Sequence, residues 1–206
     1  MTTAVIVASG PSLTVEQTQL VDRAHKAGRC RVIVVNDNWQ LLPDADVLYA
    51  ADSRWWRIHW PAVSAGFRGE MWTCKRETAK QYGICHIDST PRKPGLSRTP
   101  GLIHEGGNSG YQAIGLAFDF HIRFRLDLKR IALIGFDMQH RPGDPPHWFG
   151  KHPAGLSNAG GVKDWAPKFN ALADDLRAEG VELLNCSLRT ALTVPRGDLA
   201  DVLTNL

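Results

Sequence analysis

The sequence predicts an α/β fold in which a mostly parallel sheet of about six to seven strands lies between two layers of helices. Short apolar runs alternate with helical patterns along the whole chain. A glycine turn follows the first apolar run and opens a helical one. Three successive apolar runs end in small polar residues, and in a doubly wound sheet such ends share one edge, where ligands bind. With 206 residues, the chain fits one Rossmann-like three-layer α/β/α domain over residues 1–206.

The first half of the chain alternates in this way. Apolar composition predicts five strands, at residues 4–8, 31–35, 47–51, 71–74 and 84–88. Helical spacing predicts helices at residues 14–27, 54–63 and 77–82. The second helix contains Trp55, Trp56 and Trp60, and two of these at helical spacing fit core packing better than a stacking platform for a ligand. Residues 89–106 contain three prolines and form a loop long enough to have a function of its own.

The second half of the chain begins with a helix that Asn108 or Ser109 caps. Residues 120–129 fit the end of this helix and a connection, followed by a buried strand at 130–135. A helix at 163–178, a strand at 181–186 and a short helix from about Asp198 complete the domain. Between them, residues 138–162 form a long loop that we expect to cover the active site.

Composition excludes several classes of protein. With 43% apolar and 22% charged residues, the chain is ordinary for a globular protein, and no run approaches the length of a membrane span. No secretory signal is recognisable, so we expect a cytoplasmic protein. The net charge of +3 is mild, and the basic residues of the 89–106 loop lack interleaved aromatic residues, so no specific nucleic-acid partner is indicated. The four cysteines are expected to be reduced core residues: Cys30, Cys74, Cys85 and Cys186.

Two glycine turns are candidate anion sites. In the first, Ser9, Gly10, Pro11 and Ser12 follow the first strand; in the second, Gly106 and Gly107 precede Asn108, Ser109 and Gly110 at a helix start. A helix start exposes unpaired amides and the positive end of a dipole, a combination that favours phosphate. The alternatives are a plain strand-to-helix turn for the first and a simple helix cap for the second.

Polar residues at strand ends extend this candidate site. Asn36 and Asn38 follow the second strand, where they could contact a base or ribose or only form a turn. Asp52 follows the third strand, and Asp137 follows the strand at 130–135.

The loop at 138–162 is rich in histidine. His140, His147 and His152, together with Asp137 and Asp144, could bind a divalent metal. We favour a general base instead, because histidine titrates near neutral pH and can accept a proton from a hydroxyl group. For any one of these histidines taken singly, the simplest alternative is a solvent-exposed loop residue without a function.

Several segments together resemble the bacterial sialyltransferases that use CMP-sialic acid, and a broader set of uncharacterised phage and bacterial proteins of similar layout. The resembling segments are Ala8-Ser-Gly-Pro-Ser12, Val35-Asn36, Asn108-Ser-Gly110, Ile134-Gly-Phe-Asp137, His147-Trp-Phe-Gly-Lys-His152, and the helix and cysteine-containing strand at 163–186. The chain departs from that family at Ser9, where the family has asparagine. Two tyrosines that assist the leaving phosphate are also missing, and Gln139, His140 and Arg141 occupy their region.

The resemblance implies a glycosyltransferase-like protein that binds a nucleotide or nucleotide-sugar and transfers the sugar without metal or other cofactor. His147 would be the general base, with Arg141 and His152 beside it in the catalytic set. The implied nucleotide-binding residues are Ser9, Gly10, Pro11, Ser12, Asn36, Asp52, Asn108, Ser109, Gly110 and Asp137.

Two other functions remain open at this point. One is a phage or prophage accessory protein that binds nucleotide without catalysis, and the other is a metal-dependent hydrolase that uses the loop histidines. The partners expected are a nucleotide-sugar donor and an unidentified acceptor. Trp148 and Phe149 suggest either a lid or a contact within a homo-oligomer.

Overall fold

The computed structural model describes residues 2–91 and 93–204. Its main feature is a seven-stranded sheet in which every neighbouring pair of strands is parallel, in the order β5-β4-β3-β2-β1-β8-β9. The strands are β1 (Thr2–Val7), β2 (Arg31–Val35), β3 (Val47–Tyr49), β4 (Glu70–Thr73), β5 (Cys85–His86), β8 (Leu128–Ile134) and β9 (Glu182–Asn185). The predicted Rossmann-like three-layer sandwich is confirmed.

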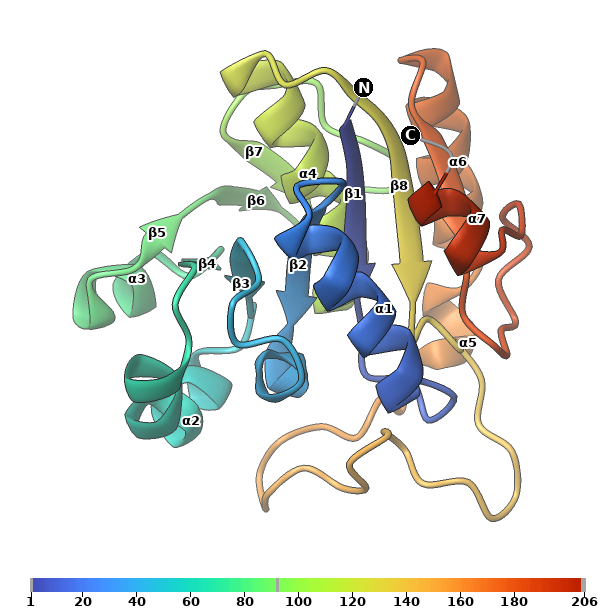
Figure 1. Cartoon of the computed structure of the whole chain (residues 1–206). Coiled ribbons are helices and arrows are strands. Elements are labelled where there is room, and N and C mark those ends of the chain that lie inside the picture. Colours follow the sequence, from blue (N-terminus) through green and yellow to red (C-terminus); the bar gives the residue numbers. More distant parts are fainter. Residues whose placement is uncertain (1, 92, 205–206) are drawn as a thin grey trace.

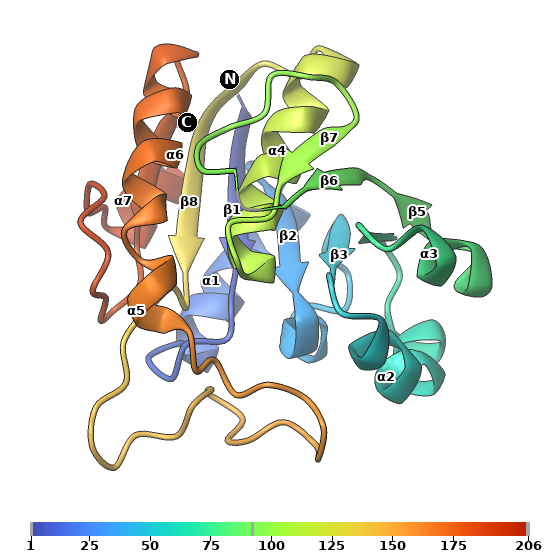
Figure 2. The ribbon, with the colours of Figure 1, turned by 180° about the vertical axis from the view of Figure 1, so that it is seen from behind.

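Helices cover both faces of this sheet (Figures 1 and 2). One apolar cluster joins the sheet to α1 (Val15–Lys26), α2 (Ser53–Gly66) and α7 (Leu199–Thr204). A second cluster on the opposite face joins it to α4 (Ser109–Phe124) and α6 (Lys168–Ala178). Trp55 and Trp56 of α2 are almost completely buried in the first cluster, and Trp60 is partly buried against it, so the core role expected for tryptophans of this helix is confirmed.

The order of the strands creates a switch point beside β1. The chain proceeds outward from β1 to β5, crosses back through α4, and adds β8 on the other side of β1. Loops that leave β1 and β8 therefore diverge in opposite directions, and in open parallel sheets the crevice between such loops is the usual ligand site. Gly10 and Gly135 meet there, where the Gly10 amide donates to the Gly135 carbonyl at 2.8 Å. A β-carbon on Gly10 would lie 2.5 Å from that carbonyl oxygen, so only glycine fits.

Four local predictions were wrong. The expected strand at 84–88 divides: β5 joins the main sheet, while β6 (Asp88–Thr90) pairs in parallel with β7 (Leu102–His104) from the expected 89–106 loop. These strands have only two or three residues each, too few to show an alternating pattern. Cys85 on the edge strand β5 is exposed rather than in the core. The expected helix at 163–178 is two helices, α5 (Val162–Trp165) and α6, because Pro167 precedes α6 and cannot donate a backbone hydrogen bond.

Other predictions hold closely. The helix at Asn108 runs to Phe124, so the first half of 120–129 is a helix end as expected. The C-terminal helix starts at Leu199, one residue after its expected start. The short helix α3 (Arg76–Tyr82) follows β4, and the 3-10 helix η1 (Asn36–Gln40) follows β2. Residues 138–161 contain no helix or strand, as predicted for a long loop.

Within the described residues, no helix has the length and apolar character needed to cross a membrane.

Candidate functional site

A cavity of about 550 Å³ opens at the carboxyl edge of the sheet, over the switch point between β1 and β8. Its walls come from the loops after β1, β2, β3 and β8, from the start of α4, and from the 138–162 loop. Eleven of the sequence-predicted site residues line it: Ser9, Gly10, Pro11, Asn36, Asp52, Asn108, Ser109, Gly110, Asp137, His147 and His152. Ser12 and Arg141 do not line it. The sheet therefore gathers segments that lie far apart in the sequence.

The start of α4 presents free hydrogen-bond donors to this cavity. Asn108 caps the helix, and its Oδ1 accepts from the Tyr111 amide at 2.9 Å. The amides of Ser109 and Gly110 have no partner within the described part of the chain, as the first turn of a helix dictates. The Asn108 Nδ2 is buried and also lacks a partner. Together with the dipole of a 16-residue helix, these donors suit an anionic group.

Lysine adds positive charge near the same helix start. Lys75 lines the cavity, and its Nζ lies 4.0 Å from the Glu105 carboxylate. The Lys168 Nζ donates to the Gly106 carbonyl at 2.9 Å, which fixes the turn that precedes Asn108. An anion at the start of α4 would therefore meet amide donors and at least one lysine side chain that lines the cavity.

The turn after β1 behaves differently. The Ser12 amide donates to Asp137 Oδ2 at 3.0 Å, and the Ser12 hydroxyl donates to Asp137 Oδ1 at 2.8 Å. The Gly10 and Leu13 amides donate to backbone carbonyls, and Pro11 has no N–H group. The amide donors from Gly10 to Leu13 are thus used within the protein, and this turn cannot wrap a phosphate in the way a P-loop does.

Asp137 fixes that turn from the end of β8. Its side chain is almost fully buried, and burial raises the pKa of its carboxyl above the usual value, while the two bonds from Ser12 act in the opposite direction. Asp137 therefore has a structural partner as well as a position on the cavity wall. The interaction joins the loops on both sides of the switch point.

The two asparagines after β2 have different surroundings. Asn38 is completely buried: its Nδ2 donates to Val7 O and Ser9 Oγ, and its Oδ1 accepts from the Trp148 indole at 2.8 Å. Its side chain is occupied within the protein, so of the two alternatives open for Asn38 the structural one holds rather than contact with a base or ribose. Asn36 lines the cavity in a left-handed conformation at φ 52°, and its buried Oδ1 has no partner within the described residues.

His147 projects from the 138–162 loop into the buried wall of the cavity. Its side chain stacks on Phe149 with ring centroids 5.0 Å apart, and its Nε2 is buried without a hydrogen-bond partner among the described residues. Burial lowers the pKa of His147 to about 4, with the neighbouring His152 contributing in the same direction. The imidazole is therefore neutral at physiological pH, and its unpartnered Nε2 belongs to a residue of the cavity wall.

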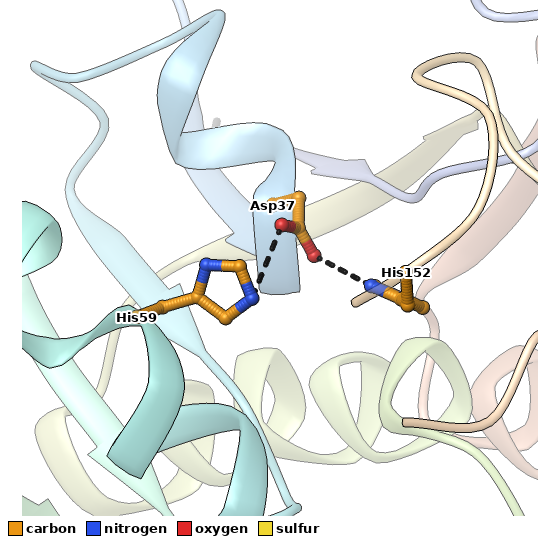
Figure 3. A group of neighbouring side chains, drawn as sticks. All are labelled: Asp37, His59 and His152. Atoms are coloured by element: carbon orange, nitrogen blue, oxygen red, sulfur yellow. Dashed lines mark ion pairs between the residues drawn. The ribbon is translucent and has the colours of Figure 1, made fainter. Parts of the chain in front are cut away.

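His152 lies beside His147 and faces a carboxylate on the opposite side (Figure 3). Its Nδ1 lies 3.3 Å from Asp37 Oδ2, and the His59 Nε2 of α2 lies 3.6 Å from Asp37 Oδ1. Burial lowers the pKa of His152, against the opposing effect of Asp37. The Trp55 indole donates to Asp37 Oδ2 at 2.9 Å, which orients the carboxylate.

The metal-binding set considered from the sequence does not assemble. Asp144 pairs with Arg189 at 2.9 Å, Asp137 is occupied by Ser12, and His140 is exposed with its Nε2 on the Ala159 carbonyl. Of that set, only His152 belongs to the single metal-capable group in the described part of the chain, which is Asp37, His59 and His152. Trp148 and Phe149 are half-buried against the domain rather than exposed.

Several residues of this region are not among those predicted from the sequence. Lys75 and Trp165 line the cavity, and Asp37 and His59 meet His152 behind its wall. Asp37 stands between two asparagines that were considered, directly after a strand, and this position was the available indication. His59 lies one helical turn after Trp55, and nothing in its local sequence distinguishes it from a surface histidine.

Comparison with known proteins provides no family for this chain. No family model matches it, and no curated protein or solved structure is significantly similar.

Proposed function

We propose that this protein is a glycosyltransferase-like enzyme that binds a nucleotide-sugar in the cavity at the carboxyl edge of the sheet. The observation that carries the proposal is the pairing of two features in one cavity. The same space of about 550 Å³ is lined by the start of α4, which has free amide donors, and by His147, whose buried Nε2 has no partner among the described residues. A phosphate site and a neutral base together suit the transfer of a group from a phosphate to a hydroxyl.

The donor phosphate would bind at the start of α4. The amides of Ser109 and Gly110 and the Asn108 Nδ2 would donate to its oxygens, and Lys75 would add positive charge. The nucleoside would extend toward Ser9, Gly10 and Asn36, where the unpartnered Asn36 Oδ1 can accept a hydrogen bond from a base or ribose. In this arrangement the turn after β1 would form part of the cavity wall beside the nucleoside and would make no contact with the phosphate.

His147 would act as the general base. Its Nε2 would accept the proton of the acceptor hydroxyl while the hydroxyl oxygen forms a bond to the anomeric carbon. The bond from that carbon to the phosphate oxygen breaks, and the nucleotide leaves with the bonding electron pair. The amides at α4 would stabilise the charge that develops on the leaving phosphate. None of these steps requires a metal ion, and Arg141, which lies outside the cavity wall, would take part only if the loop moved.

The test combines donor binding with turnover. A panel of CMP-, UDP- and GDP-linked sugars is screened by thermal shift, and the donor that stabilises the protein is tested for release of free nucleotide in the presence of candidate hydroxyl acceptors. We expect His147→Ala to lower turnover by about 10²- to 10⁴-fold while leaving donor affinity nearly unchanged. The control is His86→Ala, a histidine on the edge strand β5 that does not line the cavity.

Two results would reject the proposal. Turnover by His147→Ala at the parent rate would remove the assigned base. Donor binding with no turnover by the parent protein, across all acceptors, would support a nucleotide-binding accessory protein instead.

A further inference from the structure

We propose that Asp37, His59 and His152 form a binding site for a divalent metal ion of the zinc class, and that this ion fastens the 138–162 loop to the sheet. The proposal does not require glycosyl transfer, although His152 also lines the cavity and belongs to the catalytic set that the resemblance implies. It starts from the cluster in Figure 3, where one carboxylate and two imidazoles face one another.

The geometry of the cluster suits a single ion. Its ligand atoms all lie within 4.8 Å of one another. In a tetrahedral zinc site with ligands at about 2.0–2.1 Å, neighbouring ligand atoms are about 3.3 Å apart. Two distances are close to that value, 3.3 Å from the His152 Nδ1 to Asp37 Oδ2 and 3.6 Å from the His59 Nε2 to Asp37 Oδ1, so each imidazole faces a different oxygen of the carboxylate. The remaining separation, between the two imidazole nitrogens, is no more than 4.8 Å and would have to shorten when an ion binds.

Burial supplies an independent indication, because two buried ring nitrogens of this group have no hydrogen-bond partner among the described residues. The side chains of Asp37 and His152 are only 4% and 6% exposed. The His152 Nδ1 and the His59 Nε2 make no hydrogen bond to any described residue. No lysine or arginine of the described chain pairs with Asp37. A buried carboxylate flanked by unpaired ring nitrogens is costly unless a cation compensates it.

The surroundings hold these side chains in place. The Trp55 indole donates to Asp37 Oδ2, an outer contact of the kind that orients a ligating carboxylate. The Trp55 ring also stacks on His59, with centroids 4.7 Å apart. On the other side, His147 and Phe149 pack against His152 at centroid distances of 4.6 and 5.0 Å.

The three ligands come from three separate segments: η1 after β2, helix α2, and the 138–162 loop. A metal ion would therefore cross-link the loop to the body of the sandwich. Because His147 lies on the same loop and contacts His152, the cross-link would also hold the cavity wall closed. Two imidazoles and one carboxylate leave a fourth coordination position for water, as in many zinc sites with three protein ligands.

The first measurement is metal binding by the full-length protein. After treatment with a chelator, the protein is titrated with Zn²⁺ by calorimetry and with Co²⁺ by visible absorption. We expect one equivalent of either ion and the intense d–d bands of a four-coordinate cobalt site. His59→Gln should weaken Zn²⁺ binding by at least about 100-fold, because it removes one of only three ligands. His59 is partly exposed on α2, so this variant should fold even if Asp37→Asn does not.

The matched control is His86→Gln. His86 also faces a carboxylate, with its Nε2 3.8 Å from Asp88, but it lies on β5 at the edge of the sheet. The His86→Gln protein should bind Zn²⁺ with the affinity of the parent protein. Parent protein that binds no Zn²⁺, or His59→Gln and His152→Gln proteins that bind it as tightly as the parent, would overturn the site.

Proteolysis tests the cross-linking role. Lys151 is exposed and precedes His152, so trypsin can cleave between them when the loop is open. Zn²⁺ should slow this cleavage in the parent protein and in His86→Gln, but not in His59→Gln. Cleavage at the same rate with and without Zn²⁺ in the parent would reject the role of the ion in holding the loop.

Discussion

The two glycine turns at the carboxyl edge of the sheet look equivalent in the sequence and differ in the structure. Both join an extended segment to a helix, and both line the cavity. In the turn after β1, the amides of Gly10, Ser12 and Leu13 donate to carbonyl groups or to Asp137. At the start of α4, the amides of Ser109 and Gly110 have no partner among the described residues.

The difference teaches that a glycine turn is an anion site only when the fold leaves its amides unused. Asp137 is a protein carboxylate that occupies the donors of the first turn, in the position where a ligand anion would otherwise bind. Within the part of the chain that the structure describes, the first two helical amides of the second turn have no such internal acceptor. We therefore expect changes in the first turn to alter mainly stability, and changes in the second to alter mainly ligand affinity.

The largest expected effect is that of Gly10→Ala. The added β-carbon would lie 2.2 Å from Asp137 Oδ1 and 2.5 Å from the Gly135 carbonyl, and the second of these is backbone that cannot move aside alone. We expect the free energy of unfolding to fall by at least about 3 kcal/mol, measured by chemical denaturation. Gly160→Ala is the control, since nothing lies near its β-carbon, and it should change stability by less than about 0.5 kcal/mol. A Gly10→Ala protein as stable as the control would show that the two loops are not tightly apposed.

A smaller effect is expected for Ser12→Ala. It removes the hydroxyl donor to a buried carboxylate and should cost about 1–3 kcal/mol at neutral pH. Because the pKa of Asp137 is raised by burial, the folded protein protonates this carboxyl above the usual aspartate range as the pH falls. The hydrogen bond from Ser12 favours the ionised form of Asp137. Its removal should therefore cost the most stability above the raised pKa and the least below it.

The measurement for Ser12→Ala is a series of denaturation curves from neutral to acidic pH. The difference in free energy of unfolding between the variant and the parent protein should decrease as the pH falls through the raised pKa of Asp137. A difference that stays constant with pH would mean that the hydroxyl does not stabilise the carboxylate. Nucleotide affinity should change little, because Ser12 does not line the cavity.

The smallest effect on stability is expected for Asn108→Ala, which tests the turn at the start of α4. Loss of the cap on α4 should cost about 1 kcal/mol of stability. The same change removes the unpartnered Nδ2 from the cavity, so we expect affinity for the stabilising nucleotide to fall by about tenfold, or about 1.4 kcal/mol. Calorimetric titration of the folded variant checks this, with Thr14→Ala, which removes the equivalent cap of α1, as the control. Equal nucleotide affinities in the two variants would remove the distinction between the turns.

The sequence by itself determined the class of fold and the edge at which polar residues gather. Apolar runs such as residues 31–35 and the capped helix at Asn108 are local patterns, so their spacing was sufficient to identify them. Since parallel strands place their carboxyl ends together, eleven of the predicted site residues reached one cavity. Strands of two or three residues, such as β5 and β7, were missed or misplaced because so few residues carry no periodicity.

Only the tertiary structure decided which of these polar groups are free. The partner of Ser12 is Asp137, 125 residues away, and the partner of Asn38 is Trp148, 110 residues away. Asp37, His59 and His152 come together from a strand end, a helix face and a long loop, none of which indicates the others in the sequence. A buried polar group bonds to whichever partner the fold brings within about 3 Å. That proximity is set by packing rather than by local sequence.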